Sequence, residues 1–141
     1  MSLTVSPIRV ERKENEFDLF DTITKSIEKK GYSIKEGDVI VISSKFVSNA
    51  QGRLLELDSV RTSNQSNVLS KKFRIKPQFA EVIIRESDKI FGGISGFVIS
   101  SSDNILAPNA GIDKSNAKKG KVILYPFDPY LVAEQLRRKF F

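Results

Sequence analysis

A short polar loop near the C-terminal end of the chain holds the densest group of side chains that could do chemistry. Residues 108–116 combine amides, a carboxylate, a hydroxyl and a glycine between two strand candidates. Amide, hydroxyl and backbone N–H groups can bind an anion, and Asp113, the only carboxylate of the loop, offers an oxygen ligand to a cation. The same composition also fits an ordinary turn in which Asn and Asp cap their own backbone. The loop is therefore a candidate site for phosphate and a divalent cation, with a simple turn as the alternative.

A second polar segment, residues 43–53, follows the apolar run Val39–Ile42. An unbroken β-branched run is typical of a strand buried on both faces, and ligands of open α/β sheets bind beyond the carboxyl ends of such strands. Hydroxyl and N–H groups there could bind phosphate, although the spacing is not that of a Walker loop. The alternative is a strand that leads into a solvated turn, with Lys45 extending into water.

The composition restricts the chemistry further. The chain has 141 residues, no His and no Cys, and a formal net charge of +6. This excludes Ser-His-Asp catalysis, thiol nucleophiles, disulfides and zinc sites built from His or Cys. Any metal must be held by oxygen, which indicates Mg²⁺, Mn²⁺ or Ca²⁺. No apolar run is long enough to span a bilayer and no secretion signal is recognisable, which favours the cytoplasm.

The hydrophobic periodicity predicts a mixed α/β layer architecture in one domain, residues 1–141, with about five strands and four helices. Strands are expected at 3–10, 39–42, 96–101, 105–107 and 122–124, and helices at 17–30, 63–73, 77–87 and from Pro129 onward. Val39–Ile42 is expected to be the central strand. Gly92 and Gly93 are expected to end the helical pattern of the third helix, and Asp128 is expected to cap the last helix.

Four segments together resemble, in order, the signature blocks of the coenzyme F420-0:γ-glutamyl ligase family. They are residues 37–53, Arg85-Glu86-Ser87, Asn109–Asn116 and Leu124–Pro129. The resemblance runs from about Val5 to the last residue, and the Asn-Ala-Gly-Ile-Asp-x-Ser-Asn block is its most specific part.

The resemblance implies a GTP-dependent ligase that joins L-glutamate to coenzyme F420-0 through a γ-linked amide. It implies Mg²⁺ or Mn²⁺ as cofactor, with K⁺ as a further candidate, and catalysis by positioning and charge neutralisation. Asp113 matches the metal ligand. Ser44, Asn49 and Asn116 match nucleotide-binding positions.

The chain departs from the family pattern in places. Asn49 stands where the family usually has Lys, and Gln51 stands where it has Glu. The resemblance also implies roughly another hundred residues with further metal ligands, so we expect an incomplete half-site. A homodimer, or a partner chain that supplies the other half, is expected.

Two other functions remain open at this point. The first is a catalytically incomplete domain of the same family that binds nucleotide or a partner chain. The second is a basic nucleic-acid-binding protein, because basic residues cluster at 71–76 and 137–139. Neither basic cluster is interleaved with exposed-looking aromatic residues, which favours solvated faces, so nucleic acid is the least favoured partner.

Overall fold

The computed structural model describes residues 3–11, 13, 16–115 and 120–141. Within these ranges lie five α-helices and five β-strands, so the expected mixed α/β class is confirmed. The elements, in chain order, are α1 (Leu19–Lys29), α2 (Ser44–Ala50), β1 (Leu54–Glu56), α3 (Asn64–Phe73), α4 (Pro77–Arg85), β2 (Lys89–Ile94), β3 (Phe97–Ser102), β4 (Ile105–Pro108), β5 (Lys121–Ile123) and α5 (Pro129–Phe140). Helix α2 and strands β1 and β2 are the elements that the periodicity did not predict.

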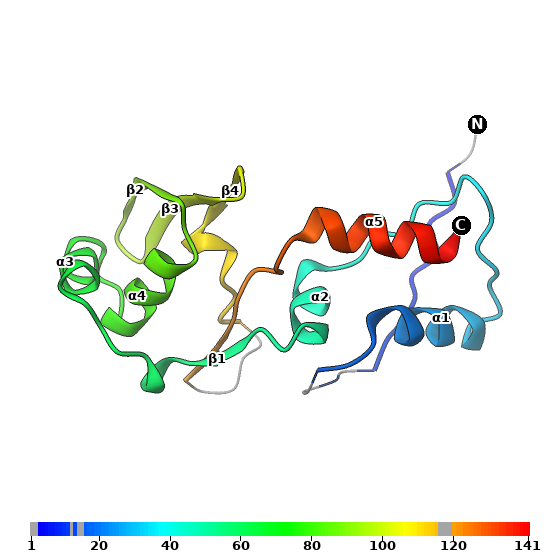
Figure 1. Cartoon of the computed structure of the whole chain (residues 1–141), viewed down its shortest axis with the longest axis horizontal. Helices are drawn as coiled ribbons and strands as arrows, with labels where there is room; N and C mark the ends of the chain where they lie inside the picture. Colours follow the sequence, from blue (N-terminus) through cyan, green and yellow to red (C-terminus); the bar gives the residue numbers. More distant parts are fainter. Residues whose placement is uncertain (1–2, 12, 14–15, 116–119) are drawn as a thin grey trace.

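The elements form an elongated molecule with two ends (Figure 1). Helices α3 and α4 lie at one end with the antiparallel sheet β2-β3-β4, and helices α1, α2 and α5 lie at the other. Strands β1 and β5 pair antiparallel between the two ends, with Leu54 opposite Ile123 and Glu56 opposite Lys121. This two-stranded ribbon carries the chain from one end to the other and back.

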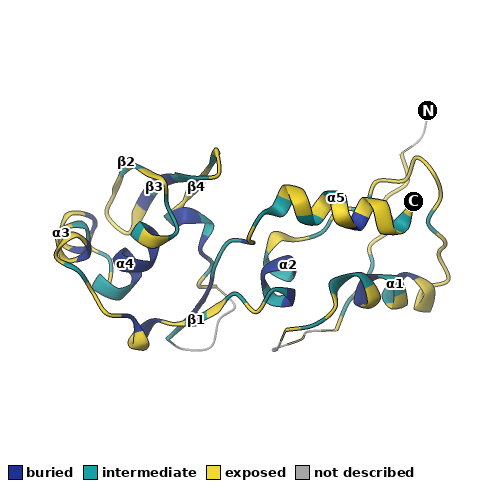
Figure 2. Cartoon of the chain, in the orientation of Figure 1, coloured by how far each residue is buried: buried dark blue, intermediate teal, exposed yellow. Residues whose placement is uncertain are grey.

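The larger hydrophobic core surrounds α4. Phe79, Val82 and Ile83 lie on one face of this helix, as the periodicity predicted, and each is at most 1% exposed. Val98 of β3 and Val122 of β5 complete the centre of this cluster. Figure 2 shows buried residues of α4 and β3 in dark blue at this end of the molecule.

In the sheet β2-β3-β4, the strands predicted at 96–101 and 105–107 pair as the hairpin β3-β4. Asp103 and Asn104 form its two-residue turn, both with positive φ (49° and 64°), which short polar residues tolerate. Gly92 and Gly93 were expected to end the third helix, but α4 ends earlier, at Arg85, and the two glycines lie within β2, beside a bulge. A Cβ at Gly93 would lie 2.1 Å from the Phe97 carbonyl oxygen, so the close strand approach requires glycine.

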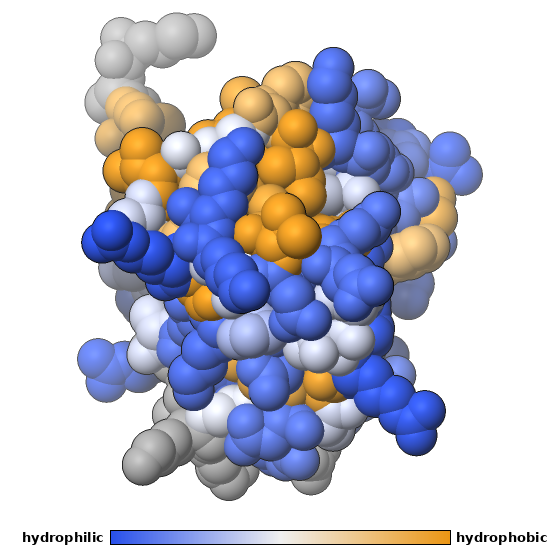
Figure 3. Space-filling model, turned by 90° about the vertical axis from the view of Figure 1, so that its left-hand side faces the viewer, coloured by the Kyte–Doolittle hydropathy of each residue, from blue (hydrophilic) through white to orange (hydrophobic). Residues whose placement is uncertain are grey.

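The exposed face of this sheet carries apolar side chains. Ile94 lies opposite Phe97 in the ladder, and both are exposed, as are Phe91 and Leu106. Figure 3 views the molecule from this end and shows apolar surface surrounded by hydrophilic residues.

A smaller core joins α1 to α5. Ile23 and Ile27 of α1 pack with Leu136 of α5, and the rings of Phe20 and Phe140 meet at 4.8 Å. Gly31 follows α1 with φ +76°, a conformation that favours glycine after a helix end. The predicted cap of the last helix is confirmed, because the Asp128 side chain accepts a hydrogen bond from the Leu131 N–H at the start of α5. The prediction of one domain is not tested by these two cores and stays a prediction.

The prediction of a central strand at Val39–Ile42 is wrong. No ladder joins this segment to another among the described residues, and Val39 and Val41 are 86% and 89% exposed. Within this segment, Ile42 is the residue that is partly buried against the smaller core. β-Branched residues favour an extended backbone, but a strand also needs a hydrogen-bonding neighbour, which local sequence cannot supply.

The expected first strand at 3–10 is wrong for the same reason. Residues 3–10 form no ladder with any described segment, and Leu3 and Val5 are exposed. Contact with the rest of the fold comes from Ile8, which packs on the smaller core, and from Lys30, whose Nζ donates to the Pro7 carbonyl at 2.6 Å.

Across the described residues, every helix is too short or too polar to cross a lipid bilayer.

Candidate functional site

Helix α2 positions the first set of candidate residues. It begins directly after Ser43, so Ser44 and Lys45 occupy the first turn of a helix, which neither interpretation of this segment predicted. Ser44 is exposed. Lys45 and Asn49 are four residues apart and therefore lie on the same face of the helix. Lys45 therefore lies next to Asn49, the position at which the family pattern has a lysine.

The backbone of Asp113 is held by strand β5. Its N–H donates to the Ile123 carbonyl at 2.8 Å, and its carbonyl accepts from the Ile123 N–H at 2.9 Å. Just before it, Ala110 adopts a left-handed backbone (φ 55°), and so does Gly111 (φ 69°). The loop of residues 108–115 is therefore a shaped turn tied to the ribbon, as the turn interpretation expected, and its role as a binding site stays a prediction.

The Asp113 side chain contacts residues of both polar segments. Its Oδ2 forms an ion pair with Lys45 Nζ. Its Oδ1 accepts hydrogen bonds from the Ser115 N–H at 2.6 Å and from the Ser115 hydroxyl at 2.7 Å. Lys45 Nζ also lies 3.4 Å from Ser115 Oγ. We call Lys45, Asp113 and Ser115 the acidic-loop cluster.

These contacts lower the pKa of the Asp113 carboxyl. Partial burial raises the pKa of its carboxyl, but hydrogen bonds from Lys45 and Ser115 lower it more, to about 2. The side chains of Lys45 and Asp113 are 25% and 30% exposed. Asp113 is therefore ionised at neutral pH and accessible to a ligand.

The acidic-loop cluster fits one kind of metal site only. Among the described residues, no group of three or more Asp and Glu side chains could hold a metal ion. Mg²⁺ is commonly held by one or two carboxylates together with substrate phosphates and water. Asp113 can supply one such carboxylate to a metal–phosphate complex, whereas a metal ion alone would find too few ligands here.

Two other predicted residues, Asn49 and Ser44, make no contact with Asp113 among the hydrogen bonds and ion pairs of the described residues. Asn49 lies in the last turn of α2, where its carbonyl accepts from the Gly52 N–H at 3.1 Å. Asn116 lies outside the described residues, so its prediction stays untested.

A second group of polar residues was not predicted as a site. Arg53 follows α2, and its Nε donates to the Tyr125 carbonyl at 2.7 Å while its terminal nitrogen pairs with Glu86. Arg85, by contrast, bonds to Glu81 on its own helix and to the Arg61 carbonyl. In the sequence, Arg53, Glu86 and Tyr125 belong to three separate blocks, and their contacts appear only in the folded chain.

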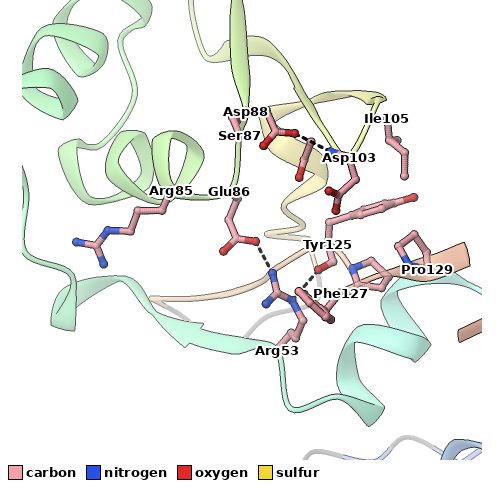
Figure 4. A pocket seen from close by; sticks show the side chains of 12 residues that line it. Arg53, Arg85, Glu86, Ser87, Asp88, Asp103, Ile105, Tyr125, Phe127 and Pro129 are labelled. Carbon is pink, nitrogen blue, oxygen red and sulfur yellow. Dashed lines mark hydrogen bonds and ion pairs between the residues drawn. The ribbon is translucent and has the colours of Figure 1, made fainter. Parts of the chain in front are cut away.

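Arg53 and Glu86 line a pocket of about 300 Å³ between the hairpin β3-β4 and the segment that leads into α5 (Figure 4). The pocket is formed by Arg53, Arg85, Glu86, Ser87, Asp88, Ser102, Asp103, Ile105, Tyr125, Pro126, Phe127 and Pro129. Three of the four signature blocks thus meet at one pocket. The fourth block contains Gly111, which packs against the Tyr125 ring.

Comparison with known sequences identifies the family. The sequence model described as F420-0:γ-glutamyl ligase matches residues 7–141. The chain belongs to this family. Its resemblance to the family blocks is therefore confirmed over almost the whole chain.

Curated relatives agree with this assignment. The chain is 36% identical over 140 residues to the coenzyme F420:L-glutamate ligase of Methanopyrus kandleri, and the alignment covers 98% of this chain and 54% of that protein. It is 32% identical over 109 residues to the enzyme of the same name from Methanocaldococcus jannaschii (77% and 43%). For the one from Archaeoglobus fulgidus the identity is 30% over 105 residues (74% and 42%). The chain spans about half the length of the curated relatives it matches.

Proposed function

We propose that this chain supplies part of the active site of a GTP- and divalent-metal-dependent ligase that joins L-glutamate to coenzyme F420-0. The proposal rests on membership of the ligase family over residues 7–141. It is supported by the acidic-loop cluster, in which two family blocks 70 positions apart meet at one charged site.

The proposed reaction needs no His or Cys. A carboxylate oxygen of the precursor attacks the γ-phosphorus of GTP, the bond to the β,γ-bridging oxygen breaks, and GDP leaves. The glutamate amine then attacks the acyl phosphate carbon, inorganic phosphate leaves, and the nitrogen loses a proton to form the amide. The protein's contribution is to hold the reactants in place and to neutralise the phosphate charge.

Lys45 and Asp113 have complementary roles in this proposal. Lys45 would contact a phosphate oxygen, and Asp113 would bind Mg²⁺ or Mn²⁺ that the phosphates bring with them. Their ion pair holds the two side chains in place before the nucleotide arrives. Further metal ligands would come from outside the described residues, through a longer chain, a second copy or a partner chain.

The first experiment measures thermal unfolding with GTP, with Mn²⁺ and with both. We expect GTP and Mn²⁺ together to raise Tm, by roughly 8 °C at one hundred times the dissociation constant. Mn²⁺ alone should have little effect, because Asp113 is the only carboxylate of the cluster. Absence of any joint effect would contradict the proposal for this chain.

Two variants locate the effect. Asp113→Asn should fold but lose the joint stabilisation by GTP and Mn²⁺. Glu56→Gln is the matched control, because Glu56 forms a similar ion pair with Lys121 at 2.8 Å but lies outside the cluster. An equal response in wild type and Asp113→Asn would remove Asp113 from the site.

An activity assay separates the ligase from a binding domain of the same family. Release of GDP and phosphate that depends on both F420-0 and glutamate would indicate a competent ligase. The single carboxylate of the cluster favours binding without turnover when the chain is alone, which is the second candidate function.

Nucleic acid binding is the weakest alternative. In the basic C-terminal helix, Glu134 pairs with Arg137 and Arg138 at 2.8 Å, which offsets part of the positive charge there. Steep loss of DNA or RNA affinity with rising salt, without any response to GTP, would favour that alternative.

A further inference from the structure

The segment Val39–Ile42 has the side-chain pattern of a strand, although it forms no ladder within the described chain. Val39 and Val41 are 86% and 89% exposed, whereas Ile40 and Ile42 are partly buried. This alternation is typical of extended backbone, in which successive side chains point to opposite sides. One side of the segment therefore meets the smaller core through Ile42, and the other side presents two valines to water.

The backbone of residues 39–42 also lacks a neighbour. No described residue forms a hydrogen bond with the N–H or carbonyl groups of these four residues. Backbone hydrogen bonding resumes at Ser43, whose carbonyl accepts from the N–H groups of Phe46 and Val47 as α2 begins. A row of accessible backbone groups beside apolar side chains is a template for an added strand.

The N-terminal segment, residues 3–10, does not supply that strand. It forms no ladder with any described segment, and it exposes Leu3 and Val5. Two segments that belong to the end with α1 and α5 thus leave large apolar side chains in water. Uncovered apolar surface of this kind usually marks a place where another surface docks.

We propose that residues 39–42, which we call the docking segment, pair with a β-strand from the part of a γ-glutamyl ligase that this chain does not match. The strand would bond to the backbone of the docking segment, and its neighbouring elements would cover Val39 and Val41. The curated relatives contain such sequence, because this chain spans about half their length. β-Branched or aromatic side chains on the added strand would pack best on this segment.

A second copy of this chain fits the docking segment less well. Two copies would pair four residues with four, and a two-stranded ribbon of this size is marginal by itself. The second copy would also bring its own exposed Val39 and Val41, so the apolar surface would double instead of being covered. A strand that belongs to a larger sheet meets both needs, because it brings neighbours of its own.

The docking segment lies close to the acidic-loop cluster. It leads through Ser43 into α2 (Figure 1), and Lys45 follows Ile42 after no more than about 11 Å of chain. A strand docked there passes near the ion pair of Lys45 and Asp113, where the proposed function requires further metal ligands. The docking itself needs no nucleotide, so the inference goes beyond the proposed function and can fail separately.

The experiment co-expresses this chain with a tagged second polypeptide, the part of the Methanopyrus kandleri ligase outside the matched region. We expect the two polypeptides to co-purify as a one-to-one complex. Hydrogen exchange is then measured on the chain alone and on the complex. The amides of residues 39–42 should exchange rapidly in the chain alone, and at least about tenfold more slowly in the complex, because pairing gives them acceptors.

Val41→Lys tests the apolar side of the docking segment, and Val68→Lys is the matched control. Val68 is also an exposed valine, but it lies on α3 at the other end of the molecule. Both variants should be as stable as the wild type in urea, since each valine already faces water. Val41→Lys should lower the yield of the complex about tenfold or more, and Val68→Lys should leave it unchanged.

The inference fails if no complex forms, if the amides of residues 39–42 exchange equally fast in the complex and in the chain alone, or if both variants give the same yield. Protection of these amides in the chain alone, together with the mass of two copies in sedimentation, would make a second copy the occupant and would also overturn the inference. None of these measurements includes GTP or a metal ion, so each result leaves the proposed function to its own test.

Discussion

At the scale of single side chains, the site depends on contacts between residues far apart in the chain. Lys45 reaches Asp113 and Ser115, and Arg53 reaches Glu86 and the Tyr125 carbonyl. Charged hydrogen bonds of this kind are stronger than neutral ones and orient the groups that make them. The two contact sets therefore hold the Asp113 carboxylate and the backbone of Tyr125 in place.

The first prediction concerns pH. The folded pKa of Asp113 is about 2, below the value of 3.8 for the free side chain, so its contacts stabilise the fold above about pH 4. This contribution is lost as the pH falls from about 4 to 2. Asp113→Asn should reduce the free energy of unfolding by about 1 kcal/mol at pH 6, allowing for solvent screening.

Urea unfolding of both proteins at pH 6 and near pH 2 measures this difference. The gap between wild type and Asp113→Asn should close at the lower pH. A gap of equal size at both values would show that the ionised carboxylate does not stabilise the fold.

The second prediction concerns Gly111. Gly111→Ala should lower the free energy of unfolding by about 2–4 kcal/mol, because alanine meets both the left-handed backbone and the Tyr125 ring. Gly31→Ala is the control, since Gly31 has a similar φ (+76°) but nothing within 4 Å of an added Cβ. Equal losses in the two variants, measured by denaturant unfolding, would mean that the Tyr125 contact is unimportant.

At the scale of elements, the short helix α2 connects several parts of the site. Lys45 of this helix forms the ion pair with Asp113. Gln51 and Arg53, just after the helix, form hydrogen bonds to the backbone of residues 125–127. The family pattern has Glu at position 51, which can accept from the Phe127 N–H but cannot donate to its carbonyl. In this chain, Gln51 makes both hydrogen bonds.

The third prediction tests this clamp. Gln51→Ala should destabilise the fold by about 1 kcal/mol, and Gln51→Glu by less, because one of the two hydrogen bonds survives. Hydrogen exchange at the Phe127 amide is the specific measurement: protection should fall strongly in Gln51→Ala and partly in Gln51→Glu. Unchanged protection in Gln51→Ala would contradict a clamping role.

At the scale of the whole molecule, the two hydrophobic cores differ in size. Among the residues that the structure describes, the core around α4 contains ten buried residues and the core between α1 and α5 contains three. Local stability follows the number of buried apolar contacts. The end formed by α1 and α5 is therefore expected to open more readily than the end formed by α3, α4 and the sheet.

The fourth prediction follows from this difference. In native-state hydrogen exchange, amides of α1 and α5 should exchange faster than those of α4. Phe79→Ala should cost about 3–5 kcal/mol, because Phe79 is 1% exposed, and should accelerate exchange across the larger core. Equal protection in α1, α5 and α4 would instead indicate one cooperative unit, in line with the single-domain prediction.

Much of the fold could be predicted from local patterns. The helices α1, α3, α4 and α5 follow from apolar spacing with caps, and the β3-β4 hairpin follows from its polar turn. The segments 3–10 and 39–42 were wrongly predicted as strands, because apolar alternation shows extended backbone but not whether a partner strand is present. Helix α2 was missed because its seven residues are too few to show a period.

By itself, the sequence determined the mixed α/β class and the family and made Asp113 a candidate site residue, because these depend on residue types and on their order along the chain. The tertiary structure alone decided that Lys45 is the partner of Asp113 and that Arg53, Glu86 and Tyr125 surround one pocket. The physical reason is that such contacts depend on how β1 pairs with β5, which brings segments about 70 positions apart together. Hydrogen-bond pairing between distant strands is a property of the whole fold, and no local pattern encodes it.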